Sequence, residues 1–119
     1  MTRLKLLVAF AVTAAVIAVP MAQARQSATT LTGTVGPGFT ITLKKGTTKV
    51  TKLKHGAYTI KVSDKSNIHN FRLKGPGVNK ATSVAAVGSK TWTVTLKAGK
   101  YTYVCDPHAS TMKGAFTVK

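Results

Sequence analysis

The strongest constraint on the fold is a series of short segments in which apolar and polar residues alternate, separated by glycine-containing turns. Successive side chains of a β-strand point to opposite faces, so each segment predicts a strand with one buried face. The residues predicted to face inward are Leu31, Gly33 and Val35; Phe39, Ile41 and Leu43; Tyr58, Ile60 and Val62; Trp92, Val94 and Leu96; and Phe116 and Val118. No segment after residue 24 shows a helical period. Short strands at this spacing predict an all-β fold, an antiparallel sandwich or barrel.

Residues 1–24 have the features of a secretory signal peptide. Arg3 and Lys5 form a positive start, residues 6–19 form an apolar run, and Ala22-Gln23-Ala24 offers a small-x-small cleavage site. The run is shorter than the ~20 residues that a membrane span needs, although an uncleaved anchor is the alternative. We therefore expect a protein exported to the periplasm, the cell envelope or the extracellular space, with no transmembrane segment after cleavage. A polar lead-in over residues 25–30 would precede one domain over residues 31–119.

The expected mature chain is strongly basic. Removing residues 1–24 takes away two of the 18 basic residues and neither of the two acidic ones, which leaves a net charge of +14. Such a field favours anionic partners of any kind. The lysines are spread along the strands, as at Lys44, Lys49 and Lys54, and this spread is typical of a solvated sheet face. No nucleic-acid motif is present, so we expect no specific nucleic-acid partner; a metal-free cationic binding module is one alternative function.

The only cysteine, Cys105, ends a predicted strand and is followed by His108 and Met112. Thiolate, imidazole and thioether groups together are donors that select copper over magnesium or calcium. Pro107 removes a main-chain donor and should end the strand pairing, so the donors would lie in a short loop. The alternative for this segment alone is a buried free thiol, a surface histidine and a core methionine.

A repeated sequence pattern assigns the two other histidines, His55 and His69, to opposite ends of the domain. Residues 53–59 resemble residues 96–102, and both read as a strand end, a glycine turn and a new strand. By this analogy the strand that follows Gly56 starts at the far end of the domain and finishes near Cys105. His55 would then be a turn residue remote from Cys105. His69 would begin a strand over residues 68–74, on its inward face and beside the Cys105 loop, as a further metal donor.

With these residues in place, residues 31–119 resemble the cupredoxins of the plastocyanin/azurin superfamily, which are small blue copper proteins. The resemblance is carried by the His69-Asn70 pair and by the Tyr-x-Cys-x-Pro-His run that contains Cys105 and His108. It implies a Greek-key β-sandwich, and one type 1 copper ion held by the ligands His69, Cys105, His108 and Met112. Two departures from the family pattern are the three-residue gap before Met112 and the presence of Asp106 where the family often has Ser or Thr.

The resemblance implies a one-electron carrier between redox proteins and not an enzyme. Copper oxidases and nitrite reductases need further histidine-rich copper sites, whereas this chain has three histidines in all. A copper store or chaperone that uses the same ligands is the alternative. The net charge predicts redox partners with acidic docking surfaces, and the carrier is expected to be a monomer.

Overall fold

The computed structural model describes residues 27–119, together with residue 9 and residues 11–16. Most of the predicted signal peptide and the first two residues of the lead-in lie outside the described residues. The described part of the chain contains no helix with the length and hydrophobicity that crossing a membrane would require.

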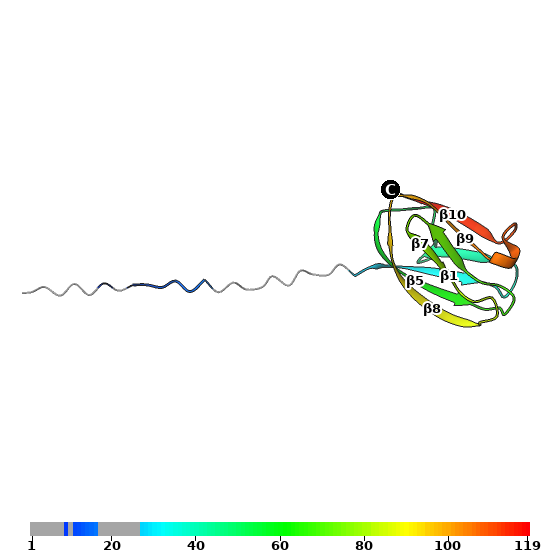
Figure 1. Ribbon diagram of the computed structural model, residues 1–119, viewed down its shortest axis with the longest axis horizontal. Helices are drawn as coiled ribbons and strands as arrows, with labels where there is room; N and C mark the ends of the chain where they lie inside the picture. The colour runs from blue at the N-terminus through cyan, green and yellow to red at the C-terminus, as the bar shows by residue number, and fades with distance from the viewer. Residues whose placement is uncertain (1–8, 10, 17–26) are drawn as a thin grey trace, which may run out of the picture.

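The described residues form two five-stranded sheets that pack face to face (Figure 1). The strands in chain order are β1 (Thr29–Val35), β2 (Ile41–Lys45), β3 (Thr48–Lys49), β4 (Lys52–Leu53), β5 (Gly56–Asp64), β6 (Arg72–Gly75), β7 (Val78–Ala81), β8 (Gly88–Leu96), β9 (Gly99–Val104) and β10 (Lys113–Val118). One sheet has the order β3-β2-β1-β5-β8, and the other has the order β4-β10-β9-β6-β7. The chain crosses repeatedly between the sheets, so the predicted β-sandwich is confirmed.

The pairing is mixed. β1 runs parallel to β5 and β4 runs parallel to β10, whereas the other paired strands are antiparallel. The antiparallel sandwich expected from the sequence is therefore wrong for these two pairs. A parallel pair needs a connection that crosses over, and here that connection passes through the opposite sheet.

The strand directions define two ends of the domain. β5 pairs with β8 from Gly56 opposite Leu96 to Asp64 opposite Gly88, and β9 runs in the same sense, from Gly99 to Val104. The carboxyl ends of β5 and β9 therefore meet at one end, which we call the loop end. The opposite end, where β10 finishes, we call the terminal end (Figure 1).

The core lies between the sheets and follows the predicted alternation. Its largest fully buried side chains are Tyr101, Tyr103, Phe71, Leu31, Leu43, Ile60, Leu73 and Leu96. Two rings stack in parallel across it, Phe71 on Tyr103, with centroids 5.8 Å apart and planes 3° apart. Gly33 on β1 is needed beneath this stack, because a Cβ atom there would lie 2.9 Å from the ring of Phe71.

Two predicted details differ from the structure, both at the loop end. Phe39, predicted to face inward, precedes β2 and is 64% exposed. The strand predicted over residues 68–74 begins only at Arg72, because residues 68–71 belong to the loop after β5. Asn70 consequently leaves the strand alternation and turns inward, where it is buried.

Candidate metal centre

A compact loop after β9 carries three of the predicted ligands. β9 ends at Val104, a single 3₁₀ turn, η1 (Asp106–His108), follows Cys105, and β10 begins directly after Met112. The main-chain N–H of Cys105 donates to the carbonyl of Met112 at 3.0 Å, and that of Met112 donates to the carbonyl of His108 at 2.8 Å. These bonds fix the backbone at all three positions. Pro107 suits the first turn of η1, since its missing N–H would have no partner there.

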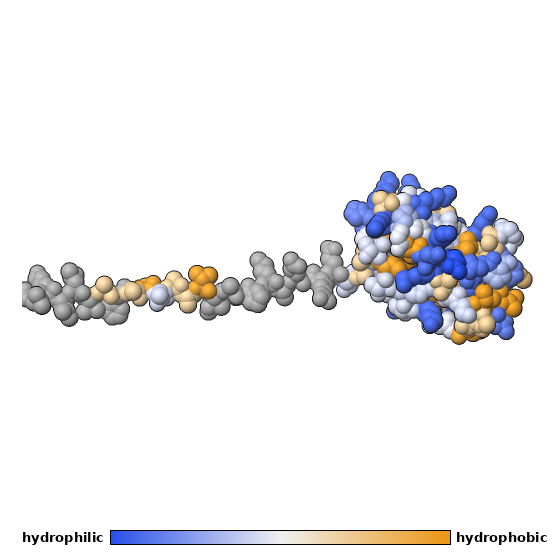
Figure 2. All heavy atoms as spheres, in the orientation of Figure 1, coloured by the Kyte–Doolittle hydropathy of each residue, from blue (hydrophilic) through white to orange (hydrophobic). Residues whose placement is uncertain are grey.

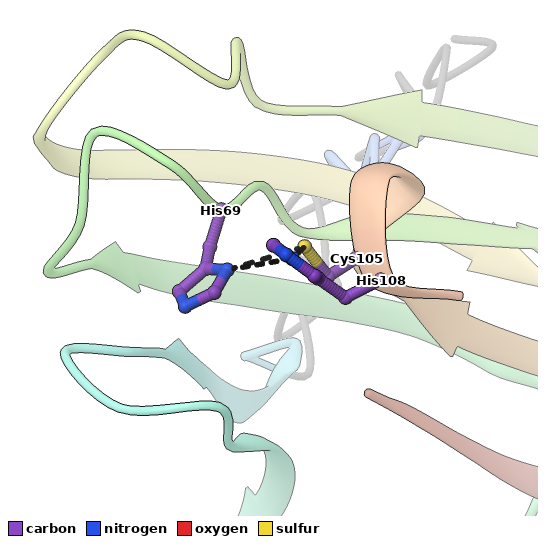
Figure 3. Close-up of side chains that lie close together, drawn as sticks. All are labelled: His69, Cys105 and His108. Carbon is purple, nitrogen blue, oxygen red and sulfur yellow. Dashed lines mark hydrogen bonds between the residues drawn. The ribbon is translucent and has the colours of Figure 1, made fainter. Parts of the chain in front are cut away.

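His69 lies in the loop between β5 and β6, and its side chain completes a cluster with Cys105 and His108 (Figure 3). The Cys105 Sγ atom lies 3.6 Å from Nδ1 of His69 and 3.6 Å from Nδ1 of His108. The two Nδ1 atoms lie 3.1 Å apart. Gly36 shapes the opposite wall: its φ of +70° favours glycine, and a Cβ atom there would lie 2.9 Å from Ser66 and 3.4 Å from the His69 ring.

These separations fit one shared metal ion. Donor atoms bound to the same ion through bonds of about 2.0 to 2.3 Å lie about 3 to 4 Å apart, which is the spacing of the three atoms here. Two imidazole nitrogens and one thiolate form the trigonal set that blue-copper sites use. Cys105 and His69 are fully buried, and Met112 is 1% exposed. The Nε2 atom of His69 is buried and has no hydrogen-bond partner among the described residues. The Nδ1 atom of the same ring lies beside the Cys105 sulfur and the His108 nitrogen, so Nδ1 is the atom that can share an ion with them.

His108 is the only member of the cluster that is partly exposed. Phe39 contacts it edge-on with ring centroids 5.0 Å apart, and contacts the His69 ring in the same way at 5.1 Å. Two further exposed apolar side chains at this end are Ile68 and Val87, which are 50% and 64% exposed. Figure 2 shows hydrophobic residues on the surface at the same end of the domain.

Asn70 joins the two loops that carry the cluster. Its side-chain carbonyl accepts a hydrogen bond from the main-chain N–H of Asp106 at 2.7 Å, and its amide donates to the Asp106 carboxylate at 2.8 Å. The same amide donates to the carbonyl of Thr82 at 3.2 Å. Since Asn70 follows His69 and Asp106 follows Cys105, these bonds fix the distance between the imidazole and the sulfur.

Asp106 is also held by an arginine. Arg72 donates to its carboxylate from Nε at 2.8 Å and from Nη2 at 2.9 Å, while its Nη1 donates to Asn79 at 2.7 Å. The hydrogen bonds from Arg72 lower the pKa of the Asp106 carboxyl group below its ordinary value. A lowered folded-state pKa means that this carboxylate stabilises the fold above the unfolded value of about 4, and that the stabilisation is lost as the pH falls through the folded value.

Residues 34–119 match the family described as copper binding proteins of the plastocyanin/azurin family. The chain belongs to this family. Its fold is also similar to reduced rusticyanin, with 24% identity, a TM-score of 0.55, and coverage of 79% of this chain and 82% of the other. Reduced auracyanin from the photosynthetic bacterium Roseiflexus castenholzii shows 22% identity and a TM-score of 0.54, with 79% and 99% covered. The curated proteins contain no match to the chain.

Family membership confirms the predicted cofactor, which is copper. The cluster of His69, Cys105 and His108 is the place in the described chain where a copper ion of this family fits. His55 lies at the terminal end, as the repeated sequence pattern predicted. Its Nδ1 donates a hydrogen bond there to the main-chain oxygen of Lys119 at 2.9 Å.

Two residues that shape this copper centre were not identified as such from the sequence. The pairing of Arg72 with Asp106 could have been anticipated, because an aspartate in a chain with 18 basic residues is expected to pair with a nearby cationic side chain. Phe39 carried no such signal, since its place in an alternating run predicts a core residue.

Proposed function

We propose that this protein is an exported one-electron carrier whose single type 1 copper ion is bound by His69, Cys105, His108 and Met112. The observation that carries the proposal is the convergence of one sulfur and two imidazole nitrogens within 3.6 Å of one another, on two loops tied by Asn70. Copper bound there supplies a one-electron couple between Cu(I) and Cu(II).

The protein's contribution to such a function is rigidity. Cys105 and His69 are buried at the edge of the core, and main-chain hydrogen bonds hold the Cys105 loop. Side chains that cannot move keep the donor geometry the same in both oxidation states, which lowers the cost of changing between them. Burial also keeps water from the sulfur, and this protects a lone thiol in an oxidising compartment.

Electrons would enter and leave through the His108 edge. This ring is the partly exposed member of the cluster, and the exposed side chains of Phe39, Ile68 and Val87 surround the same end with apolar surface. An apolar surface of this kind suits close, short-lived contact with another redox protein.

Copper storage or delivery is the second candidate. The partial exposure of His108 favours it, since a ligand at the surface is the one that an exchanging partner would displace. Carrier and store differ in their electron exchange: a carrier reacts rapidly with a redox partner while the copper stays bound. An enzymatic role is not proposed, because the three described histidines leave only His55 outside the cluster, at the other end of the domain.

Partner proteins are proposed to be acidic and the carrier to act as a monomer. Lys113 follows Met112 directly and is exposed at the loop end, where it could face an acidic side chain. We expect Lys113→Glu to slow oxidation by an acidic redox protein about fourfold at low salt. That is the effect of a two-unit charge change about 10 Å from one opposing charge in water. Stopped-flow rates measure it, and rising salt should remove the difference.

The matched control is Lys100→Glu, which makes the same change in net charge on β9 toward the terminal end. It should alter the rate less than Lys113→Glu does. Neither variant should change the rate with a small neutral oxidant. Equal slowing by both variants would contradict docking at the loop end, and slow exchange of the unmodified protein with every oxidant would favour copper storage.

Met112 is proposed as the weak axial ligand. Replacing it with leucine should keep the colour of the Cu(II) protein and raise the reduction potential, because a lost thioether donor destabilises Cu(II) more than Cu(I). Leucine has a similar volume, so the core should tolerate it at a cost below about 1.5 kcal/mol. Redox titration measures the potential. An unchanged potential would assign the axial position to a main-chain carbonyl or leave it empty.

A further inference from the structure

The terminal end carries two adjoining hollows that the copper site does not use. The larger has a volume of about 620 Å³ and lies where β4, the start of β5 and Lys119 meet. The second, of about 350 Å³, lies along β3 and β4. Both are lined by Lys45, Lys52 and Leu53, so the two hollows adjoin, and we call the pair the groove.

The groove is lined by cations and by no acidic side chain of the described chain. Lys45, Lys52, Lys54 and Lys119 line the larger hollow, and Lys45, Lys49 and Lys52 line the second. The two acidic residues of the protein lie at the loop end and are engaged there. Asp64 accepts a hydrogen bond from the main-chain N–H of Ser66 at 3.1 Å, and Asp106 is paired with Arg72.

Two main-chain oxygens along the groove already accept hydrogen bonds from the protein. The oxygen of Lys119 accepts hydrogen bonds from the main-chain N–H of His55 at 2.9 Å and from its Nδ1 at 2.9 Å. The carbonyl of Lys54 accepts from the buried Tyr58 hydroxyl at 2.6 Å. These contacts hold the loop before β5 in place and engage oxygens that would otherwise repel an anion. The charged side chains that line the groove are the five lysines, beside neutral hydroxyl groups from serine and threonine.

We propose that this groove binds an elongated, phosphate-bearing anion. Lysine recognises phosphate as a point charge, and several lysines can share the oxygens of one phosphate group. A groove that runs through two hollows with five lysines fits a chain of phosphates better than a single compact ion. The chain of phosphates can be a soluble polyphosphate or a row of lipid headgroups, because the two present the same chemistry.

The groove lies far from the copper site, so an anion bound in the groove would not cover His108. The groove lies at the end where β10 finishes, whereas the partly exposed His108 lies in the loop after β9, at the opposite end of the sheets. A protein held by this groove would present its His108 surface away from the anion. Anchoring and electron exchange could then occur at the same time, although the anchoring itself does not depend on the proposed electron transfer.

The test compares two triple variants of the purified protein that have the same net charge. In the groove variant Lys52, Lys54 and Lys119 are changed to glutamine, and in the control Lys61, Lys80 and Lys90 are changed to glutamine; all six are exposed. Binding of linear tripolyphosphate is followed by calorimetry, and binding to vesicles by sedimentation with phosphatidylglycerol or phosphatidylcholine. We expect the groove variant to bind at least about tenfold more weakly, while the control changes by about twofold or less.

Each outcome decides between sources or overturns the proposal. Selective weakening toward tripolyphosphate assigns a soluble polyphosphate, and selective weakening toward phosphatidylglycerol vesicles alone assigns lipid headgroups. Equal weakening of both variants would show attraction by net charge alone, and no binding to either probe would likewise overturn the groove. Thermal unfolding of both variants checks that they are folded, and phosphatidylcholine vesicles report any binding that is independent of anionic headgroups.

Discussion

A Cys105→Ser variant is expected to lose the intense visible band of the Cu(II) protein completely. The band arises from charge transfer between a thiolate and Cu(II), and Cys105 is the only cysteine in the chain. Serine keeps the approximate shape of the side chain, but its hydroxyl is a poor ligand for copper at neutral pH. Copper binding should therefore weaken while the sandwich stays folded. Absorption spectra and equilibrium dialysis measure the two effects.

His55→Ala is the control for that experiment. His55 lies at the terminal end, with its Nδ1 bonded to the Lys119 oxygen, so its removal should leave both the spectrum and the copper stoichiometry unchanged. A band that survives in Cys105→Ser would refute the ligand set. Loss of the band in His55→Ala would refute the orientation of the domain as well.

An Asn70→Ala variant should lose about 2 to 4 kcal/mol of unfolding free energy. Its side chain is buried and makes three hydrogen bonds, two with Asp106 and one with Thr82, and truncation would leave these partners unsatisfied. The same change should weaken copper binding by about 10- to 100-fold, as loss of groups that orient metal ligands commonly does. Denaturant unfolding and competition with a copper chelator measure the two effects.

Arg72→Gln separates this link from the ion pair beside it. The Arg72 and Asp106 side chains are 34% and 37% exposed, so breaking their pair should cost only about 0 to 1 kcal/mol. Copper affinity should change little, because Asn70 would still join the two loops. If Arg72→Gln weakened copper binding as much as Asn70→Ala, the ion pair would be the element that positions the loops.

The parts of the fold that could be predicted from the sequence are those governed by strand alternation. Tyr58, Ile60 and Val62 are buried as expected, because side-chain direction in a strand is fixed by the backbone. The location of His55 at the terminal end could also be predicted, because the repeated strand-turn-strand pattern sets the direction of β5. The meeting of His69 with the Cys105 loop depended on the same reasoning about direction.

The parts that could not be predicted depend on contacts between loops. Residues 68–71 alternate like a strand, yet their path is set by the bonds from Asn70 to Thr82 and Asp106, which no local pattern reveals. Phe39 lies beside the His69 and His108 rings because the turn before β2 reaches the loop end. The groove at the terminal end likewise brings Lys119, which follows β10, beside the lysines of β2 and β4, from which it is distant in the sequence.

Titration of the purified, metal-free protein with Cu(II) tests the central claim most directly. The account predicts one copper ion per chain and an intense blue or green colour that rises linearly to that point and then stays constant. Both properties require the sulfur of Cys105 and the two imidazoles to share one ion, as their separations of 3.1 to 3.6 Å allow. A protein that stays colourless when copper is added, or that binds it without a break at one equivalent, would contradict the account.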